Sequence, residues 1–313
     1  MHKINFENTK RDNREFSKNI NWPKISIITP SYNQGCFIEE TIISVLDQNY
    51  PNLEYIIIDG GSTDDTISII KKYESKIAYW KSEKDDGQSD AINKGFMMAT
   101  GEIVGWLNSD DYYLPNTFRS IANVYLKQKS NNDNNFWIIG NCLAKGSLDW
   151  RFESKPFTKL DILSFWNNVI GQPAVFWTSN FIGHPILEKS LNYAMDLDLW
   201  LRMRNIKPPI SINEDLAVAR YYESTKTSTG DYKRFLELKE VLTKHNDCKK
   251  QLTDRELSKK LFASCFDDYA SKSLIIPHNQ FYQQITEDWN PSFRQRFDLV
   301  FKLSKKLVKI LIK

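Results

Sequence analysis

Two adjacent aspartates, Asp110 and Asp111, have the residue type and spacing that metal-assisted chemistry needs. They follow an apolar run that begins at Ile103, and such a run is typical of a buried parallel strand. Both carboxylates then leave at the carboxyl end of the strand, where open α/β sheets bind ligands. Adjacent carboxylates repel each other unless a cation lies between them, and hard divalent ions take oxygen ligands. The pair indicates a metal-assisted site for a phosphate-bearing ligand, and the alternative is a turn that caps the next helix.

Two further aspartates, Asp196 and Asp198, stand at the start of a predicted helix in which Leu199 and Met203 share one face. Residues two positions apart do not share a helix face, so only one of the two carboxylates can readily point into a site. The alternative for Asp196 is an ordinary helix N-cap.

The elements that must position these side chains alternate between strands and helices. Apolar and β-branched runs predict strands at 24–29, 54–58, 77–80, 136–140 and 216–219 besides the one from Ile103, and helical periodicity predicts helices at 38–48, 66–73, 91–97 and 115–129. Loops at the carboxyl edges are rich in Asp, Asn, Gly and Ser, which is typical of a nucleotide-binding α/β half-domain. Neither a G-x-G-x-x-G fingerprint nor a P-loop lysine motif occurs, so dehydrogenase and kinase functions lose their support.

Composition bounds the class of protein. The chain has 313 residues, 41% of them hydrophobic, which suffices for one large domain and an appendage. Four cysteines and four histidines are scattered without the spacing of a zinc site or a disulfide framework, which favours the reducing cytoplasm. No signal-like segment and no apolar stretch long enough for a membrane span occurs in the sequence. The net charge of +3 combines about +6 in residues 294–313 with about −3 in the rest of the chain. A nucleic-acid binder would more often carry its basic charge over the folded body, so this class loses support.

Four motifs follow one another along the chain: Pro-Ser-Tyr-Asn at 30–33, Asp-Gly-Gly-Ser-Thr-Asp at 59–64, Asp-Ala-Ile-Asn-Lys-Gly at 90–95 and Leu-Asn-Ser-Asp-Asp at 107–111. Together they resemble the motifs of the family 2 glycosyltransferases of the GT-A fold. The resemblance covers residues 23–230 and implies an α/β, GT-A-like nucleotide-sugar-binding fold with a mixed central sheet.

The resemblance also implies the donor pocket. Pro30, Tyr32, Asn33 and Asp59 would line the nucleoside pocket of a sugar nucleotide. Many relatives carry a second Asp after the strand, where it contacts the base; Gly60 stands there in this sequence, so a preference for uracil is not implied.

For the diphosphate, the resemblance implies that Asp90 and Asn93 approach the ribose and the phosphates. Asp111 would hold a Mg²⁺ or Mn²⁺ that bridges the diphosphate, and Asp110 would assist it or contact the ribose. A diphosphate leaves well only if its developing charge is neutralised, which a bound cation does. Asn108 stands where many relatives carry Asp, so the number of ligands is left open.

For the acceptor, Gln172 would hydrogen-bond sugar hydroxyls, and Asp196 matches the general base of the family's Glu-Asp motif, with Met195 in place of the Glu. Asp198 would support the base or cap the helix. A base is required because the attacking sugar hydroxyl is neutral, and a single base with in-line displacement implies inversion.

Two cations follow the last predicted strand. Relatives often place a His near position 222, and its absence leaves Arg220 and Lys226 as candidate phosphate-binding residues, with surface charge as the alternative.

The ends of the chain differ from its middle. Residues 1–22 form a polar leader, and residues 231–313 form a helical region. Residues 294–313 carry seven Lys or Arg against one Asp, beside a wide apolar arc on a helical wheel. Such a helix suits an anionic membrane surface, and packing on protein is the alternative.

The sequence thus predicts a cytoplasmic, inverting, metal-dependent glycosyltransferase that moves a sugar from a nucleotide-diphosphate donor to a glycan or a lipid-linked acceptor. Peripheral attachment to the inner face of the membrane is an open alternative to a freely cytoplasmic position. Two other functions stay open. One is a sugar-1-phosphate nucleotidyltransferase, whose Gly-rich first loop with Arg and Lys is missing here, and the other is a non-catalytic, membrane-tethered nucleotide- or glycan-binding module.

Overall fold

The computed structural model describes residues 16, 20–146, 150–156, 170–226 and 231–245. All of these belong to the first of two compact units, Met1–Ser264. Of the predicted helical region 231–313, the residues from 246 onward, which include the basic segment 294–313, lie outside the described residues, as does the polar leader 1–22 except for residues 16 and 20–22.

In the described part of the chain, nine strands form one mixed sheet in the order β3-β2-β1-β4-β8-β6-β9-β5, with β7 paired to β6. The strands are β1 (Ile25–Ser31), β2 (Leu53–Asp59), β3 (Tyr79–Ser82), β4 (Ile103–Trp106), β5 (Tyr112–Tyr113), β6 (Trp137–Gly146), β7 (Trp150–Phe152), β8 (Val175–Thr178) and β9 (Ile210–Tyr221). The first four are parallel to one another, whereas β8 runs antiparallel to β4 and β6. The predicted mixed α/β sheet is therefore confirmed.

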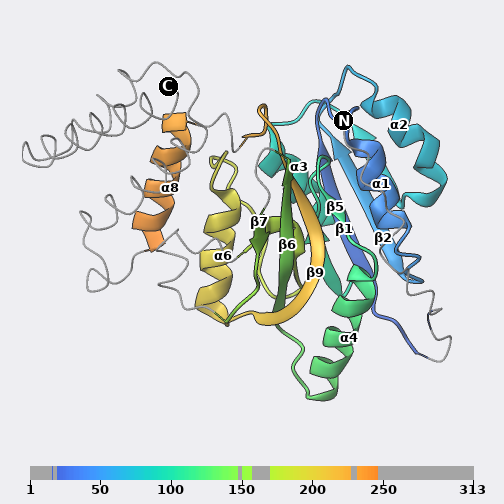
Figure 1. Ribbon diagram of the computed structural model, residues 1–313, viewed down its shortest axis with the longest axis vertical. Helices are drawn as coiled ribbons and strands as arrows, with labels where there is room; N and C mark the ends of the chain where they lie inside the picture. The colour runs from blue at the N-terminus through green and yellow to red at the C-terminus, as the bar shows by residue number, and fades with distance from the viewer. Residues whose placement is uncertain (1–15, 17–19, 147–149, 157–169, 227–230, 246–313) are drawn as a thin grey trace, which may run out of the picture. The chain divides into compact units, whose positions relative to one another are not determined.

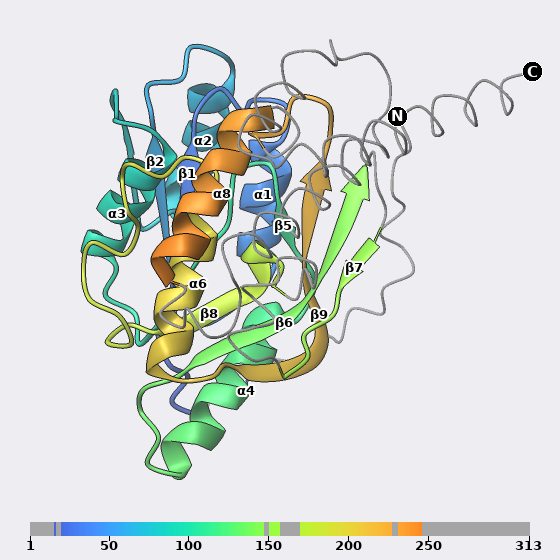
Figure 2. The same ribbon diagram turned by 90° about the vertical axis from the view of Figure 1, so that its left-hand side faces the viewer.

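Helices cover both faces of this sheet (Figure 1). They are α1 (Ile38–Leu46), α2 (Thr66–Tyr73), α3 (Gln88–Met98), α4 (Thr117–Ser130), α6 (Met195–Ile206) and α8 (Asp231–His245), with short 3-10 turns at Glu74–Lys76 and Gln172–Ala174. The helix α8 packs on α6, and Figure 2 shows the two side by side.

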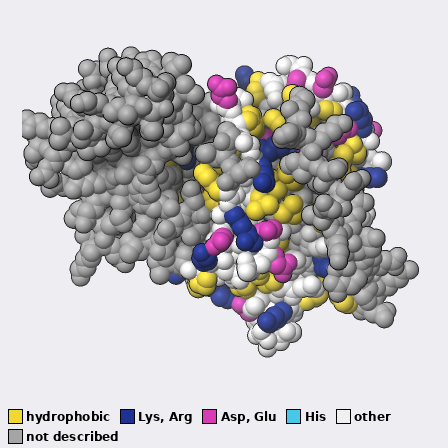
Figure 3. Space-filling view, in the orientation of Figure 1, with side chains coloured by type: hydrophobic (Ala, Val, Ile, Leu, Met, Phe, Trp, Pro, Cys, Tyr) yellow, Lys and Arg dark blue, Asp and Glu magenta, His cyan; other side chains and the backbone are white. Residues whose placement is uncertain are grey.

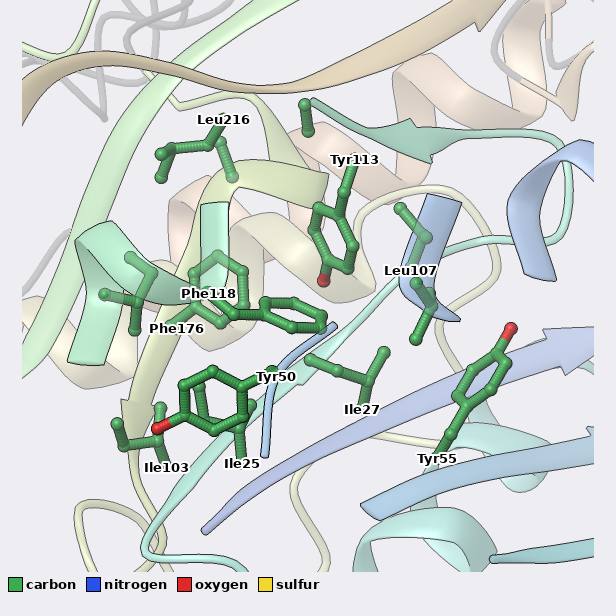
Figure 4. Close-up of a cluster of buried hydrophobic side chains, with 14 of the residues drawn as sticks. Ile25, Ile27, Tyr50, Tyr55, Ile103, Leu107, Tyr113, Phe118, Phe176 and Leu216 are labelled. Carbon is green, nitrogen blue, oxygen red and sulfur yellow. The ribbon is translucent and has the colours of Figure 1, made fainter. Parts of the chain in front are cut away.

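Alternation along β1 decides which helices pack on which face, because successive strand residues point to opposite sides. Ile25 and Ile27 join the main hydrophobic cluster with residues of α1, α2 and α4. Figure 4 shows part of this cluster, in which the rings of Tyr113, Phe118 and Phe176 pack against one another. Ile28 points to the other face, where Gly95 of α3 lies so close that an added Cβ would be 2.4 Å from the Ile28 side chain.

A tryptophan cluster fixes α6 on the α3 side of the sheet. Trp200 of α6 stacks on Trp106 of β4, with ring centroids 5.6 Å apart, and on Trp137 of β6 at 6.0 Å. Trp177 of β8 completes the cluster through edge contacts with Trp106 and Trp200. Since the aromatic rings bury a large area and pack with defined geometry, the helix that carries Asp196 has a fixed place against the sheet.

The first α/β half agrees closely with the predicted elements, and the second half differs in extent. The strand predicted at 216–219 is the end of the 12-residue strand β9. The two-residue strand β5, which directly follows Asp111 and pairs with β9, has no counterpart among the predicted elements. Among the described residues, no helix is long and apolar enough to cross a membrane. On the face that Figure 3 displays, acidic and basic side chains are interspersed.

Candidate active site

A cavity of about 770 Å³ lies at the carboxyl ends of β1, β2 and β4. Parallel strands present their following loops at this edge, so residues from distant loops converge there. Of the site residues predicted from the sequence, the lining includes Pro30, Tyr32, Asp110, Asp111, Gln172, Asp196, Arg220 and Lys226. The lining does not include Asn33, Asp59, Asp90, Asn93 or Asp198.

Asp110 and Asp111, the acid pair, lie between the end of β4 and the end of β9. Asp111 is 6% exposed, and its Oδ1 accepts a hydrogen bond from the backbone N–H of Arg220 at 2.9 Å. Asp110 is half-buried, and its Oδ2 accepts a hydrogen bond from the Tyr222 hydroxyl at 2.8 Å. Arg220 is in β9 and Tyr222 directly follows the last residue of that strand, so both aspartates are held by residues more than 100 positions away along the chain.

Both carboxyl groups have raised pKa values. Burial raises the pKa of Asp110, against the opposing hydrogen bond from Tyr222 and the charge of Arg220. Burial, and then the charge of Asp110, raise the pKa of Asp111 well above its ordinary value. A divalent cation would relieve this repulsion, and its preference for carboxylate oxygens matches the two side chains. The pair fits such an ion, although the described residues contain no group of three or more His, Cys, Asp or Glu side chains that could hold one by themselves.

A row of amides connects the acid pair with Lys226. Gln88 accepts from Lys226 Nζ at 3.0 Å and donates through Nε2 to Asn108 Oδ1 at 2.9 Å. Asn108 Nδ2 in turn donates to Gln172 Oε1 at 3.0 Å and to Asp111 Oδ2 at 3.3 Å. Gln172 donates through Nε2 to a backbone carbonyl, that of Trp106, at 2.9 Å. Each amide in the row has one orientation that satisfies its neighbours, which fixes the polar floor of the cavity.

Asp196 lies in the first turn of α6 and faces the same cavity. Burial raises its pKa, while a backbone hydrogen bond from Leu197 and the charges of Arg234 and Lys226 oppose the rise. A carboxylate with a raised pKa is a better proton acceptor than a fully solvated one. The position and the environment are those that a general base needs.

Asp198 points away from the cavity toward α8. It is 1% exposed, and its carboxylate contacts Arg202 Nε at 2.8 Å, His245 Nε2 at 2.8 Å and Lys244 Nζ at 3.2 Å. Burial alone would raise the pKa of Asp198, but the hydrogen bonds from His245, Arg202 and Lys244 outweigh it and leave the pKa far below its ordinary value. Asp196 and Asp198 therefore face different ways, as their spacing predicts.

The two candidate phosphate-binding cations differ in their surroundings. The Arg220 guanidinium contacts Glu40 and the backbone carbonyl of Asp110, and it lies over the ring of Tyr112 at 4.6 Å. Lys226 is half-buried at the cavity wall, where burial lowers its pKa against the opposing charges of Glu237 and Asp196. Arg220 is thus engaged in holding the loop of the acid pair, and Lys226 is a desolvated cation close to Asp196.

Asp59 and Asn33 shape the loops at the nucleoside end. The Asp59 carboxylate is fully buried and accepts from Gly61 N, from Ser62 N and Oγ, and from Ser82 Oγ at 2.5–3.1 Å. Asn33 has a positive φ of 51° and accepts at Oδ1 from Thr63 N at 2.9 Å. The Asp59 contacts fix the loop after β2 and join it to the end of β3, and the Asn33 contact holds the loop after β1 against the loop after β2. Contact of either side chain with a nucleoside remains a prediction.

Asp90 and Asn93 hold the segment that precedes α6. Asn93 exchanges two hydrogen bonds with the backbone of Leu187, at 2.8 and 2.9 Å. Asp90 is ion-paired with Lys94 at 2.9 Å and with Lys189. Burial alone would raise the pKa of Asp90, but the hydrogen bonds from Lys189 and Lys94 outweigh it and lower the pKa to about 2. Their predicted approach to the ribose and the phosphates stays a prediction, since both side chains lie outside the cavity lining.

Several residues that line the cavity are not among the site residues predicted from the sequence. Tyr222 lies two positions after the candidate Arg220, just past the end of β9, so continued strand alternation is a signal that could have found it. Gln88 lies two residues before the motif at 90–95. Arg234 and Leu238 come from α8, and nothing local in the sequence places this helix at the cavity.

Comparisons with known proteins show which family the chain is similar to. The profile described as Glycosyl transferase family 2 matches residues 26–181. An uncharacterized glycosyltransferase of Rickettsia typhi is 30% identical over 220 residues, which are 66% of this chain and 67% of that protein. TuaG of Bacillus subtilis, a glycosyltransferase assigned to teichuronic acid biosynthesis, is 45% identical over 95 residues, 29% of this chain and 38% of its own.

Two solved structures share the fold. Staphylococcus aureus TarS 1–349 in complex with UDP-GlcNAc superposes with a TM-score of 0.61 at 17% identity, covering 85% of this chain and 80% of that one. The mannosyltransferase PcManGT of Pyrobaculum calidifontis, in complex with GDP-Man and Mn²⁺, gives 0.55 at 17% identity, covering 93% and 87%. The family match and the 30%-identical relatives, with which the shared fold agrees, show that this chain belongs to glycosyl transferase family 2.

Proposed function

We propose that this glycosyltransferase moves one sugar, with inversion, from a nucleotide-diphosphate donor to a hydroxyl group of a glycan or lipid-linked acceptor in the synthesis of a cell-surface polysaccharide. The observation that carries the proposal is that the acid pair and Asp196 line the same cavity. An inverting transfer needs one group that stabilises the leaving group and a base that activates the acceptor, both within reach of one sugar, and these residues supply the two groups.

The acid pair would hold a Mg²⁺ or Mn²⁺ ion beside the diphosphate. When bound, the ion neutralises charge on the leaving diphosphate. Asp110 is the more exposed of the two, whereas both oxygens of Asp111 accept hydrogen bonds, from Arg220 and Asn108. We therefore assign direct ligation chiefly to Asp110 and a share of the charge to Asp111, which is the reverse of the roles that the resemblance implies. The Mn²⁺ in the PcManGT complex supports a metal in this fold.

Asp196 would accept the proton of the attacking hydroxyl group. Its carboxylate lies in a partly desolvated wall, and the charges of Arg234 and Lys226 keep its pKa from rising further. Gln172 would orient the acceptor, because its side chain lies in the cavity lining beside the row of amides.

The experiment measures binding and turnover of UDP-, dTDP- and GDP-sugars with and without Mn²⁺, beside Asp110→Asn and Asp196→Asn. We expect one nucleotide to bind in a metal-dependent way, Asp110→Asn to lose that binding, and Asp196→Asn to keep it while losing transfer. The complexes of TarS with UDP-GlcNAc and of PcManGT with GDP-Man make UDP-sugars and GDP-sugars the first donors to try. If no nucleotide bound under any metal condition, the proposal would be wrong.

Attachment to the inner face of the cytoplasmic membrane is part of the proposal and depends on the composition of residues 294–313. Seven basic residues against one acidic residue favour anionic lipid. Sedimentation with vesicles of phosphatidylglycerol, compared with phosphatidylcholine, tests it. A chain shortened at residue 293 should lose binding to the anionic vesicles, and equal binding by both chains would contradict the assignment.

A further inference from the structure

The start of α6 depends on a side chain from another helix. Ala194 is the N-cap residue of α6, and no side chain of the cap position hydrogen-bonds the helix. The Glu237 carboxylate of α8 instead accepts from the backbone N–H groups of Tyr193 at 2.5 Å and Ala194 at 2.7 Å. Hydrogen bonds to a carboxylate are stronger than those between neutral groups, and a negative charge is favourable at a helix N-terminus. Glu237 thus holds the backbone that immediately precedes Asp196.

The helix that carries Glu237 has a fixed position. Leu238, Val241 and Leu242 of α8 are at most 3% exposed and share one face at helical spacing. His245, near the end of the same face, is hydrogen-bonded to Asp198 of α6 at 2.8 Å. Because apolar packing and a buried polar contact both join α8 to α6, Glu237 is presented to the start of α6 by an anchored element.

The same carboxylate takes part in the charge balance of the cavity wall. Lys226 is influenced by the negative charges of both Glu237 and Asp196. Its Nζ also lies 5.9 Å from the ring centroid of Tyr193, whose backbone Glu237 holds. Lys226 therefore lies among the base, the segment before it and the carboxylate that fixes that segment.

From these contacts we infer that Glu237 is a positioning residue for Asp196, acting through the backbone at Tyr193 and Ala194, so that α8 is a working part of the active site. The inference rests on the proposed function, in which Asp196 is the base. Displacement of a catalytic group by about 1 Å costs up to about 100-fold in rate. Loss of Glu237 should therefore lower the rate of transfer more than the binding of the donor, which lies toward the acid pair.

The test compares Glu237→Ala, Glu237→Gln and the matched control Glu240→Ala, an exposed residue on the same helix. We expect Glu237→Ala to lower kcat by about 10- to 100-fold and to leave the donor KM within about threefold of the parent value. Glu237→Gln keeps an acceptor oxygen and should recover a large part of kcat. Glu240→Ala should behave as the parent protein.

Hydrogen exchange supplies a readout that does not need turnover. The amides of Tyr193 and Ala194 should exchange faster in Glu237→Ala than in the parent protein or in Glu240→Ala. Unchanged exchange at these amides, or equal kcat in Glu237→Ala and Glu240→Ala, would overturn the inference, as would a loss in which kcat and donor affinity fall together without rescue by Gln. If the parent protein transferred no sugar, the proposed function would fail, whereas the exchange result would still decide whether Glu237 fixes this backbone.

Discussion

The substitution Asn108→Asp tests the polar floor of the cavity at one point. Asn108 accepts one hydrogen bond, from Gln88, and donates two, to Gln172 and Asp111. An aspartate of the same shape can accept but not donate, so both donated bonds are lost. It also places a third carboxylate where Asp110 and Asp111 already have raised pKa values.

The magnitude follows from the distance. A new charge at the position of Asn108 Nδ2 would lie 3.3 Å from Asp111 Oδ2. With an effective dielectric constant of about 20, two unit charges at this separation repel by about 5 kcal/mol. Protonation of one carboxyl group limits the cost, which then becomes the free energy of holding that proton at neutral pH together with the two lost hydrogen bonds, in all about 2–4 kcal/mol.

The assay is urea unfolding at neutral pH with and without Mn²⁺. Asn108→Asp should lower the free energy of unfolding by about 2–4 kcal/mol without metal, and Mn²⁺ should restore more of it than the same ion adds to the parent protein. The control is Asn134→Asp, which adds the same charge at an exposed position. Equal stability of Asn108→Asp and Asn134→Asp without metal would refute the charge argument, and an equal gain from Mn²⁺ in both would refute the metal site.

Three further predictions concern single groups. If Asp196 is the base, kcat/KM should fall as the pH is lowered through a pKa above the ordinary 3.8, because the protonated acid cannot accept a proton. A pH–rate profile with no acid limb above that value would contradict this role of Asp196. Asp198→Asn should lower the free energy of unfolding by about 1–3 kcal/mol near neutral pH, since it loses the charge paired with Arg202 and Lys244. Because the folded pKa of Asp198 is depressed, the deficit should shrink as the pH falls below 3.8, which urea unfolding at several pH values checks. A Cβ at Gly60 would lie 2.9 Å from Asp85 Oδ2 at the cavity wall, so Gly60→Ala should weaken nucleotide binding by about 3- to 10-fold. The loss should be smaller when Asp85→Gly is also present, and a double-mutant cycle measured by calorimetry tests this.

Local patterns were enough to predict the first half of the sheet. Strands β1 and β2 are buried β-branched runs, and the helix α2 spans the predicted residues 66–73. The position of the acid pair at the end of β4 follows from the same reasoning, because parallel strands bring their following loops to one edge. The pattern was sufficient here since each signal lies within a few residues of the element it predicts.

The second half of the molecule depends on contacts between distant residues. The strand β9 begins at Ile210 and includes Asn213, Glu214 and Asp215, which are poor strand formers, and it forms because β6 pairs with it along most of its length. The same limit explains Asp90, whose motif predicts a donor contact while the structure pairs it with two lysines. A motif names the residues, and only the packing of later segments determines where each side chain points.

This dependence has a chemical consequence for the acid pair. The bond from Arg220 N to Asp111 lies beside the pairing of Tyr112 with Val218, so the acid pair is fixed by the same edge of β9 that joins β5 to the sheet. On the other side of the cavity, Glu237 of α8 holds the backbone before Asp196. The groups proposed to neutralise the leaving group and to activate the acceptor are therefore both positioned by residues that follow position 209, outside the matched segment 26–181. In this chain, the separation of these two groups therefore depends on how β9 and α8 pack against the motif-bearing half, and not on the motifs alone.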